Sequence, residues 1–167
     1  MDATENDILE QLYRRYYGSA VLYTLSLCGS QHLAEDIVSE AFVKAYLSLP
    51  SEIPSFQFWL YRVCKNLWLD HLRRQKFQAG EDALWNLADQ DTPESRYLRS
   101  EQNRALWHAI ASLPPLDREL VTLHYFSGLP LNEIAPLLGK SHAAVRQRLT
   151  RLRHTLKQRM EEQGYGL

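Results

Sequence analysis

The segment from Leu131 to Arg159 constrains the fold more than any other part of the chain. Its first part, LNEIAPLLG, is short and apolar, and it ends in Gly139, a residue type that suits a tight turn between two helices. Ser141 follows where the N-cap of a second helix is expected. Four apolar residues then recur at spacings of three and four: Val145, Leu149, Leu152 and Leu156. This period predicts one buried stripe, and the whole segment predicts a helix-turn-helix.

The opposite side of this second helix is polar. It carries His142, Ala143, Arg146, Gln147, Thr150 and Arg151. No acidic residue lies between Lys140 and Arg159. A helix that enters the major groove needs small or polar residues at its start, long donors that reach base edges, and cations that hold phosphates. A solvated surface helix is the alternative, but the ordered combination of short helix, glycine turn, cap and positive charge favours a recognition helix.

The net charge of −1 conceals two basic regions. One extends from Arg62 to Lys76, and the other from Lys140 to Arg159. Between them, residues 78–91 are rich in Gly, Ala and acidic side chains, a composition typical of a linker. We therefore expect two small domains, residues 1–77 and 92–167, joined by a flexible linker at 78–91. Cationic surfaces on both domains are compatible with a nucleic-acid partner.

Helical periodicity predicts that both domains are all-α. We expect helices at about 7–28, 33–49 and 56–76 in the first domain, and at about 92–113, 117–127, 131–138 and 141–159 in the second. Glycine and proline mark several of their ends, as in the PSEIPS loop that follows the second helix. No strand pattern, internal repeat or low-complexity tract appears.

The helix expected at 56–76 combines aromatic and cationic residues. Its aromatic residues are Phe56, Phe58, Trp59, Tyr61 and Trp68. Arg62, Asn66 and Arg73 fall at spacings that collect them on one face. Packing in a helical core explains most of the aromatic residues. A platform on which unpaired bases stack, beside a cationic track for the backbone, is the functional alternative.

Several classes of protein are excluded or disfavoured. No apolar run approaches the roughly 20 residues of a membrane span, and the polar start MDATENDILEQ lacks the pattern of a signal peptide, so we expect a cytoplasmic protein without membrane insertion. Cys28 and Cys64 are expected to be buried and reduced. His32 follows Cys28 by four residues, but no second pair completes a zinc site. Because motifs for catalysis and phosphate binding are absent, we expect no enzyme activity, no metal and no cofactor.

Three segments occur in a diagnostic order: LAEDIVSEAFVKAY, FWLYRVCKNLWLDHLRR and LPPLDRELVTLHYFSGLPLNEIAPLLGKSHAAVRQRLTRLRHTL. Together they resemble the bacterial extracytoplasmic-function sigma factors, the compact branch of the sigma-70 family that keeps only domains 2 and 4. The resemblance covers nearly the whole chain. It implies binding to core RNA polymerase, recognition of promoter DNA and assistance in strand opening. It also implies regulation by an anti-sigma factor.

The resemblance assigns roles to residues by motif position. Polymerase binding would fall to Asp36, Ser39 and Glu40. Recognition and melting of the −10 element would fall to the loop near Ser51 to Ser55 and to Arg62, Asn66 and Arg73. Reading of the −35 element would fall to His142, Ala143, Arg146, Gln147, Arg148 and Arg151.

Three positions depart from the family pattern. Ser39 stands where Gln is common, Pro136 lies inside the short helix of the helix-turn-helix, and the run from His142 to Ala144 replaces small and hydroxyl residues. A stand-alone helix-turn-helix regulator, whose first domain dimerises or senses a ligand, is the main alternative function. A nucleic-acid-processing enzyme is a third possibility, which the missing metal ligands disfavour.

Overall fold

The structure is a computed structural model that describes residues 3–48, 55–74 and 92–164. Across these ranges the regular elements are all helical, which confirms the predicted all-α fold. They are α1 (Ala3–Cys28), α2 (Gln31–Ser48), α3 (Phe56–Arg74), the 3₁₀-helix η2 (Glu94–Leu98), α5 (Glu101–Ala111), α6 (Pro115–Val121), the π-helix η3 (Thr122–Phe126), α7 (Leu131–Leu138) and α8 (His142–Glu162). The expected linker at 78–91 and the loop from Ser51 to Pro54 lie outside the described residues.

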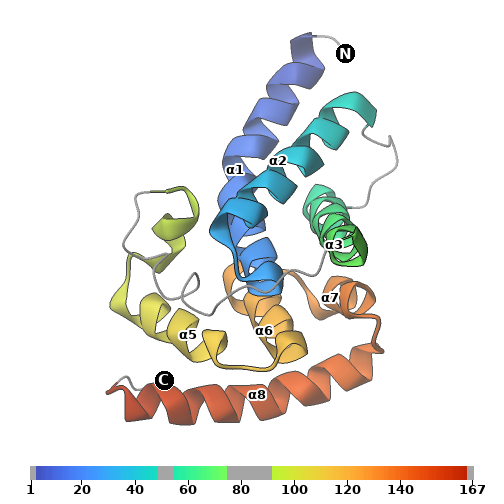
Figure 1. The fold of residues 1–167 in the computed structure, drawn as a ribbon. Coiled ribbons are helices and arrows are strands. Elements are labelled where there is room, and N and C mark those ends of the chain that lie inside the picture. The colour runs from blue at the N-terminus through green and yellow to red at the C-terminus, as the bar shows by residue number, and fades with distance from the viewer. Residues whose placement is uncertain (1–2, 49–54, 75–91, 165–167) are drawn as a thin grey trace.

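Helices α1 to α3 form the first unit of the molecule (Figure 1). Helix α2 lies along α1, and its buried face consists largely of small residues, which lets the two helices approach closely. Gly29, whose φ is 68°, ends α1 in the left-handed conformation that glycine tolerates best. Helix α3 packs against both α1 and α2. The three helices predicted for this part of the chain are confirmed, with shifts at their ends.

The C-terminal half of α1 is buried on every side. From Gly18 to Ser26 each residue is enclosed, because α2 and α3 cover one side of the helix while η2, α6 and η3 cover the other. The buried serine and threonine hydroxyl groups donate to carbonyls of α1 itself; for example, Thr24 Oγ1 donates to the Ala20 carbonyl at 2.8 Å. A helix without a polar face suits a central position in a fold.

The continuous helix predicted at 92–113 is wrong, because this stretch contains two elements. Thr92 and Ser95 exchange hydrogen bonds at the start of η2, and the chain becomes extended at Ser100. Ser100 then caps α5, since its hydroxyl accepts a hydrogen bond from the Asn103 amide at 3.0 Å. The cap is a local signal that a helical period alone does not reveal.

The helix-turn-helix is confirmed. Gly139 closes α7 with φ 66°, and the Lys140 amide donates to the Ala135 carbonyl at 3.1 Å. Ser141 caps α8 by accepting from the Ala144 amide at 3.1 Å. Pro136 lies near the C-terminal end of α7 with its ring exposed, so the helix forms despite the backbone hydrogen bond that proline cannot donate.

The second unit, η2 to α8, packs directly on the first. Helix α1 contacts η2, α6 and η3, and α8 runs along the far side of α5, α6 and α7 (Figure 1). The buried apolar residues of both units form one continuous cluster, from Ala20 in α1 to Leu156 in α8.

Candidate nucleic-acid interface

The outward side of α8 presents the predicted recognition surface. Its exposed members, which we call the α8 face, are His142, Ala143, Arg146, Gln147 and Arg151. The predicted stripe of Val145, Leu149, Leu152 and Leu156 is buried, and Met160 extends it. This stripe fixes the rotation of α8 about its axis and thereby directs the α8 face to solvent. The helix lies along an edge of the molecule (Figure 1).

Arg148 differs from its neighbours on α8. Its Nε donates to Oδ1 of Asp117 in α6, and the side chains are 38% and 14% exposed. The pair lies beside a hollow of about 270 Å³ that Arg151, Leu152 and Thr155 also line. A half-buried ion pair holds α8 against α6, so the geometry gives Arg148 a structural contact in addition to its expected contact with DNA.

The C-terminal half of α8 is attached by further cations. Arg153 Nη2 lies 3.2 Å from Nε2 of His124 in η3, and Arg159 donates to the Ala109 carbonyl of α5 at 3.2 Å. Burial lowers the pKa of His124, and the positive charge of Arg153 lowers it further. A neutral imidazole can accept the hydrogen bond from Arg153. The C-terminal part of α8 is thus attached to η3 and α5, whereas the α8 face lies in its N-terminal part.

The predicted residues of α3 are also exposed. We call Arg62, Asn66 and Arg73 the α3 face. The Arg62 guanidinium lies 5.7 Å from the centroid of the Phe58 ring, and Arg73 forms an ion pair with Asp70 at 2.9 Å. Ser55 has a local role, because its hydroxyl accepts from the Phe58 amide at 3.2 Å and caps α3.

Most aromatic residues of α3 pack inside the first unit. Tyr61 is fully buried and stacks on Tyr23 of α1 with ring centroids 4.9 Å apart. Phe56 lies 5.7 Å from Trp59 and 5.9 Å from Tyr16. These contacts support the packing explanation over a base-stacking platform for this set.

Helix α7 lies against part of the α3 face. Arg62, Asn66 and Leu69 line a hollow of about 250 Å³ whose other wall is formed by residues 136–139 of α7 and its turn. Lys65 lines the same hollow. The second unit therefore occupies space beside the predicted −10-binding residues.

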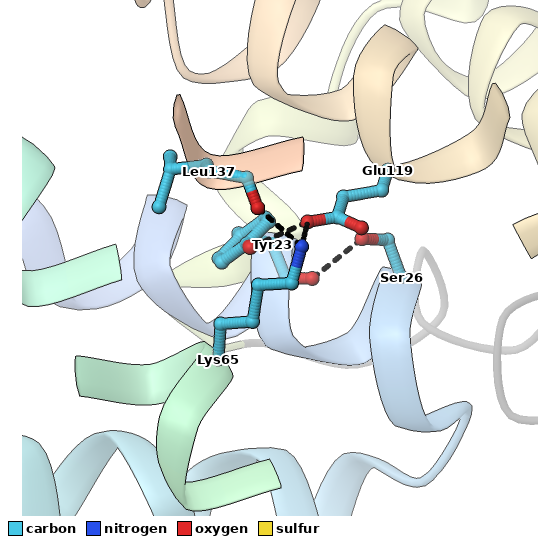
Figure 2. A network of polar contacts seen from close by, with 5 residues as sticks. All are labelled: Tyr23, Ser26, Lys65, Glu119 and Leu137. Carbon is cyan, nitrogen blue, oxygen red and sulfur yellow. Dashed lines mark hydrogen bonds and ion pairs between the residues drawn. The ribbon is translucent and has the colours of Figure 1, made fainter. Parts of the chain in front are cut away.

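Lys65 joins the two units through a polar cluster that sequence reasoning did not identify. Its Nζ donates to Oε1 of Glu119 at 2.8 Å and to the carbonyl of Leu137, and Tyr23 donates to the same Glu119 oxygen at 2.9 Å (Figure 2). Glu119 is only 5% exposed. Its partners come from residues 54 and 96 positions away in the chain, beyond the reach of helical periodicity.

The α2 surface exposes Asp36, Ser39 and Glu40 together. Asp36 Oδ2 lies 3.6 Å from Nε2 of His32 one turn earlier. Further along α2, exposed apolar side chains include Tyr46 and Leu47. The arrangement combines negative charge with apolar area, which suits a partner surface that is basic and apolar.

The chemistry of the remaining reactive groups is restrained by burial. Burial raises the pKa of the Cys28 thiol to about 11 and that of the Cys64 thiol to about 12, so both remain protonated at neutral pH.

Within residues 3–48, 55–74 and 92–164, His, Cys, Asp and Glu side chains form no group of three that could hold a metal. In the same ranges no helix has the length and apolarity needed to cross a membrane.

Two family models match the chain. Sigma-70 region 2 matches residues 12–78, which include most of α1 and all of α2 and α3. Sigma-70 region 4 matches residues 103–156, which include the helix-turn-helix. The two candidate DNA-binding faces therefore lie in separate family regions.

Curated relatives support the same assignment. The chain is 34% identical over 153 residues to the ECF RNA polymerase sigma factor SigE of Mycolicibacterium smegmatis, covering 89% of this chain and 60% of that protein. It is 31% identical to BldN of Streptomyces coelicolor, of which it spans 57%. With SigW of Bacillus subtilis it shares 32% identity over 149 residues, covering 81% of this chain and 80% of the relative.

A solved structure shares the fold. The sigma factor RpoE of Bartonella quintana, crystallised with the anti-sigma factor NepR, superposes with a TM-score of 0.65 at 21% identity, and the match covers 91% of this chain and 96% of RpoE. At this identity the likeness concerns the fold alone. The two matched regions and the relatives that the chain covers over most of their length lead to one conclusion: this chain belongs to the extracytoplasmic-function sigma factors of the sigma-70 family.

Proposed function

We propose that the chain directs core RNA polymerase to specific promoters and assists strand opening at initiation. The observation that carries the proposal is the pair of exposed, cationic helix faces on α3 and α8, one in each matched sigma-70 region. A protein with two separate DNA-binding faces can contact two promoter elements at once when polymerase holds the duplex in register.

The α2 surface is the proposed polymerase contact. Asp36, Ser39 and Glu40 are exposed side by side, and the shorter Ser39 replaces the Gln that is common in this family. Serine cannot reach as far as glutamine, so the two carboxylates would carry more of the interaction. We assign this surface to the clamp coiled coil of the largest polymerase subunit.

The two DNA faces have different proposed targets. The α3 face, together with Ser55 at its helix start, would bind the −10 element. The α8 face, together with the neighbouring Arg148, would bind the −35 element in the major groove, where Arg146 and Gln147 would contact base edges and Arg148 and Arg151 would contact phosphates. The domain limits that accompany these roles are 1–77 and 92–167, with the linker at 78–91.

The proposed role carries consequences for regulation and location. The factor would act in the cytoplasm, without catalysis or a cofactor of its own, and an anti-sigma factor would hold it inactive. RpoE of Bartonella quintana was crystallised with such an inhibitor, and it shares this fold. An inhibitor of this kind would have to cover the α2 surface, the α3 face or the α8 face.

Run-off transcription tests the proposal. Purified bacterial core polymerase is incubated with fragmented genomic DNA, with and without this protein, and new start sites are mapped. We expect new starts that share a −35 and −10 pair. A double variant, Asp36→Ala with Glu40→Ala, should lose initiation, while its weak binding to −35 duplexes stays equal to that of wild type. Glu10→Gln, which removes an exposed α1 carboxylate outside the matched region, is the control.

Absence of initiation would overturn the proposal. If the protein alone then bound duplex DNA tightly, a stand-alone helix-turn-helix regulator would replace it. Divalent-metal-dependent cleavage of the DNA would instead indicate a nucleic-acid-processing enzyme.

A further inference from the structure

We infer that Glu119 competes with DNA for Lys65. Its carboxylate holds the Lys65 ammonium in the position where Lys65 would otherwise bind a DNA phosphate. Closure of the second unit on the first and DNA binding by α3 are then mutually exclusive. This inference rests on the proposed function of the α3 face, and it adds Lys65 to that face as a binding residue. The contact between the units is thus autoinhibitory.

The clasp consists of Lys65, Glu119, Tyr23 and the Leu137 carbonyl (Figure 2). One carboxylate oxygen of Glu119 accepts both from the Lys65 ammonium, at 2.8 Å, and from the Tyr23 hydroxyl, at 2.9 Å. The Leu137 carbonyl accepts a second hydrogen bond from Lys65. An ammonium between an anionic oxygen and a carbonyl has the surroundings that a phosphate and a bridging water would supply on DNA.

Lys65 belongs by position to the DNA-facing side of α3. It lines the same hollow as Arg62 and Asn66, which lie three residues before it and one after it. Its side chain is 21% exposed, because Glu119 and α7 cover it. A DNA backbone that followed the α3 face would have to occupy the space that the turn after α7 now fills. Binding there requires the second unit to move.

Polar links cross the interface beside the shared apolar cluster. Besides the clasp, Gln57 Nε2 donates to the Ser127 carbonyl and Arg118 Nε donates to the Ser26 carbonyl, each at 2.8 Å. Opening exposes apolar residues of the shared cluster as well as these polar groups, so the closed form is the major state of the free chain.

The surface of α1 that faces the second unit also favours the closed form. Residues 18–26 have no charged side chain, and the side of α1 that meets α6 and η3 is as buried as the side that meets α2 and α3. Gly18 lies directly against η2, where an added Cβ would be 2.9 Å from the Pro93 carbonyl oxygen. A surface this specific to the second unit indicates that closure is a property of the free chain.

The test combines compactness with DNA affinity in the full chain. Small-angle X-ray scattering gives the radius of gyration, and fluorescence anisotropy with a labelled single-stranded DNA of mixed sequence gives the Kd. Glu119→Gln should expand the protein and bind the DNA about tenfold more tightly, as expected if about nine-tenths of the wild type is closed. Lys65→Gln should expand it equally but bind no more tightly than wild type, because the released cation is missing.

Two controls complete the design. Glu10→Gln removes the same charge as Glu119→Gln from an exposed ion pair on α1, so it should change neither measurement and excludes a general effect of net charge. Gln57→Ala leaves Lys65 and Glu119 intact and removes one link between the units, so it should shift both measurements in the direction of Glu119→Gln, by less. Circular dichroism melting identifies any variant that fails to fold, and Gln57→Ala then tests the inference alone.

Each unfavourable result has a definite meaning. An unchanged radius of gyration in Glu119→Gln and in Gln57→Ala would show that the contact does not hold the units together. Expansion without tighter binding, or equal tightening in Lys65→Gln, would show that Glu119 does not compete with DNA for Lys65. Run-off transcription by wild-type protein is independent of these results, so failure of the clasp and failure of the sigma-factor proposal are distinguishable.

Discussion

Helices α3 and α8 were predicted by the same reasoning and differ in their surroundings. Both carry polar and cationic residues on one side at helical spacing. The α8 face is directed to solvent, since its buried stripe packs on the rest of its own unit. The α3 face is bordered by α7 from the other unit, and Lys65 beside it is bound to Glu119. The second unit therefore leaves the α8 face open to solvent, whereas it borders the α3 face and covers Lys65 beside it.

The comparison shows that exposure within a domain does not establish availability in the whole chain. A helical period tells which residues share a side of a helix. It does not tell whether a distant segment lies over that side. The two faces should accordingly respond to different mutations. The α8 face should be sensitive to changes in the buried stripe beneath it, and the α3 face to changes in the contact between the units.

The largest effect on stability is expected when the buried stripe of α8 is truncated. Leu149 is 2% exposed in the stripe beneath the α8 face. Leu149→Ala should reduce the free energy of unfolding by about 2–5 kcal/mol, because it removes buried apolar area and leaves a cavity. Urea denaturation measures the loss. Thr150→Ala, at the neighbouring exposed position, is the control and should stay within about 0.5 kcal/mol of wild type.

The contact between the units can be tested at Gly18. Ala is a better helix former than Gly by up to about 1 kcal/mol, so a helical Gly→Ala change should stabilise the protein unless space is lacking. At Gly18 the new methyl group would collide with Pro93 and Tyr97, and we expect a loss of about 1–3 kcal/mol together with a larger radius of gyration. Gln11→Ala, at an exposed position of α1, should show no such loss. A Gly18→Ala protein as stable and compact as wild type would contradict the tight approach of η2.

Specificity should reside in the α8 face without a change in stability. Arg146 is exposed, so Arg146→Ala should leave the melting temperature unchanged and relax preference at one or two base pairs by about 1–3 kcal/mol. Anisotropy with −35 duplexes from the mapped promoters gives the preference. Arg151→Ala should instead weaken binding to all sequences, with a smaller salt dependence.

Arg148 provides the contrast within α8. Because its removal leaves Asp117 without its ion-pair partner, Arg148→Ala should lower the melting temperature as well as the affinity. Equal loss on every sequence for Arg146→Ala would exclude a base-reading role for that residue.

The smallest effect is expected at Glu94, which links η2 to α2 through a hydrogen bond with Gln31. Gln31 donates to its Oε1 at 2.8 Å, but its Oε2 has no hydrogen-bond partner among the described residues. Burial raises the pKa of Glu94 above its ordinary value of 4.5. The folded state thus favours the protonated acid, and the stability present below pH 4.5 is lost as pH rises through the raised pKa.

Glu94→Gln should consequently stabilise the protein at neutral pH, by up to about 1 kcal/mol, and favour the closed form. Thermal melts across acidic and neutral pH would show the two proteins converging as pH falls. A variant less stable than wild type at neutral pH would indicate that the ionised carboxylate makes a favourable contact.

Much of the local structure could be predicted from sequence. The stripe of α8, its Ser141 cap and the Gly139 turn are encoded within a few residues of one another, and all three are present. The break at Ser100 was missed because the helical period continues across it, while a single cap hydrogen bond decides where α5 begins. The packing of α1 against both units could not be predicted, because residues 18–26 carry no charged side chain and this pattern does not identify which elements cover each side.

Most helices, the helix-turn-helix and the two cationic faces could be predicted from the sequence, because they depend on residue spacings of three, four and seven and on single capping residues. The pairing of Lys65 with Glu119, the position of α7 beside the α3 face and the pairing of Arg148 with Asp117 could not. Such contacts join residues far apart in the chain. They are set by how whole helices pack on α1, and no local pattern specifies that arrangement.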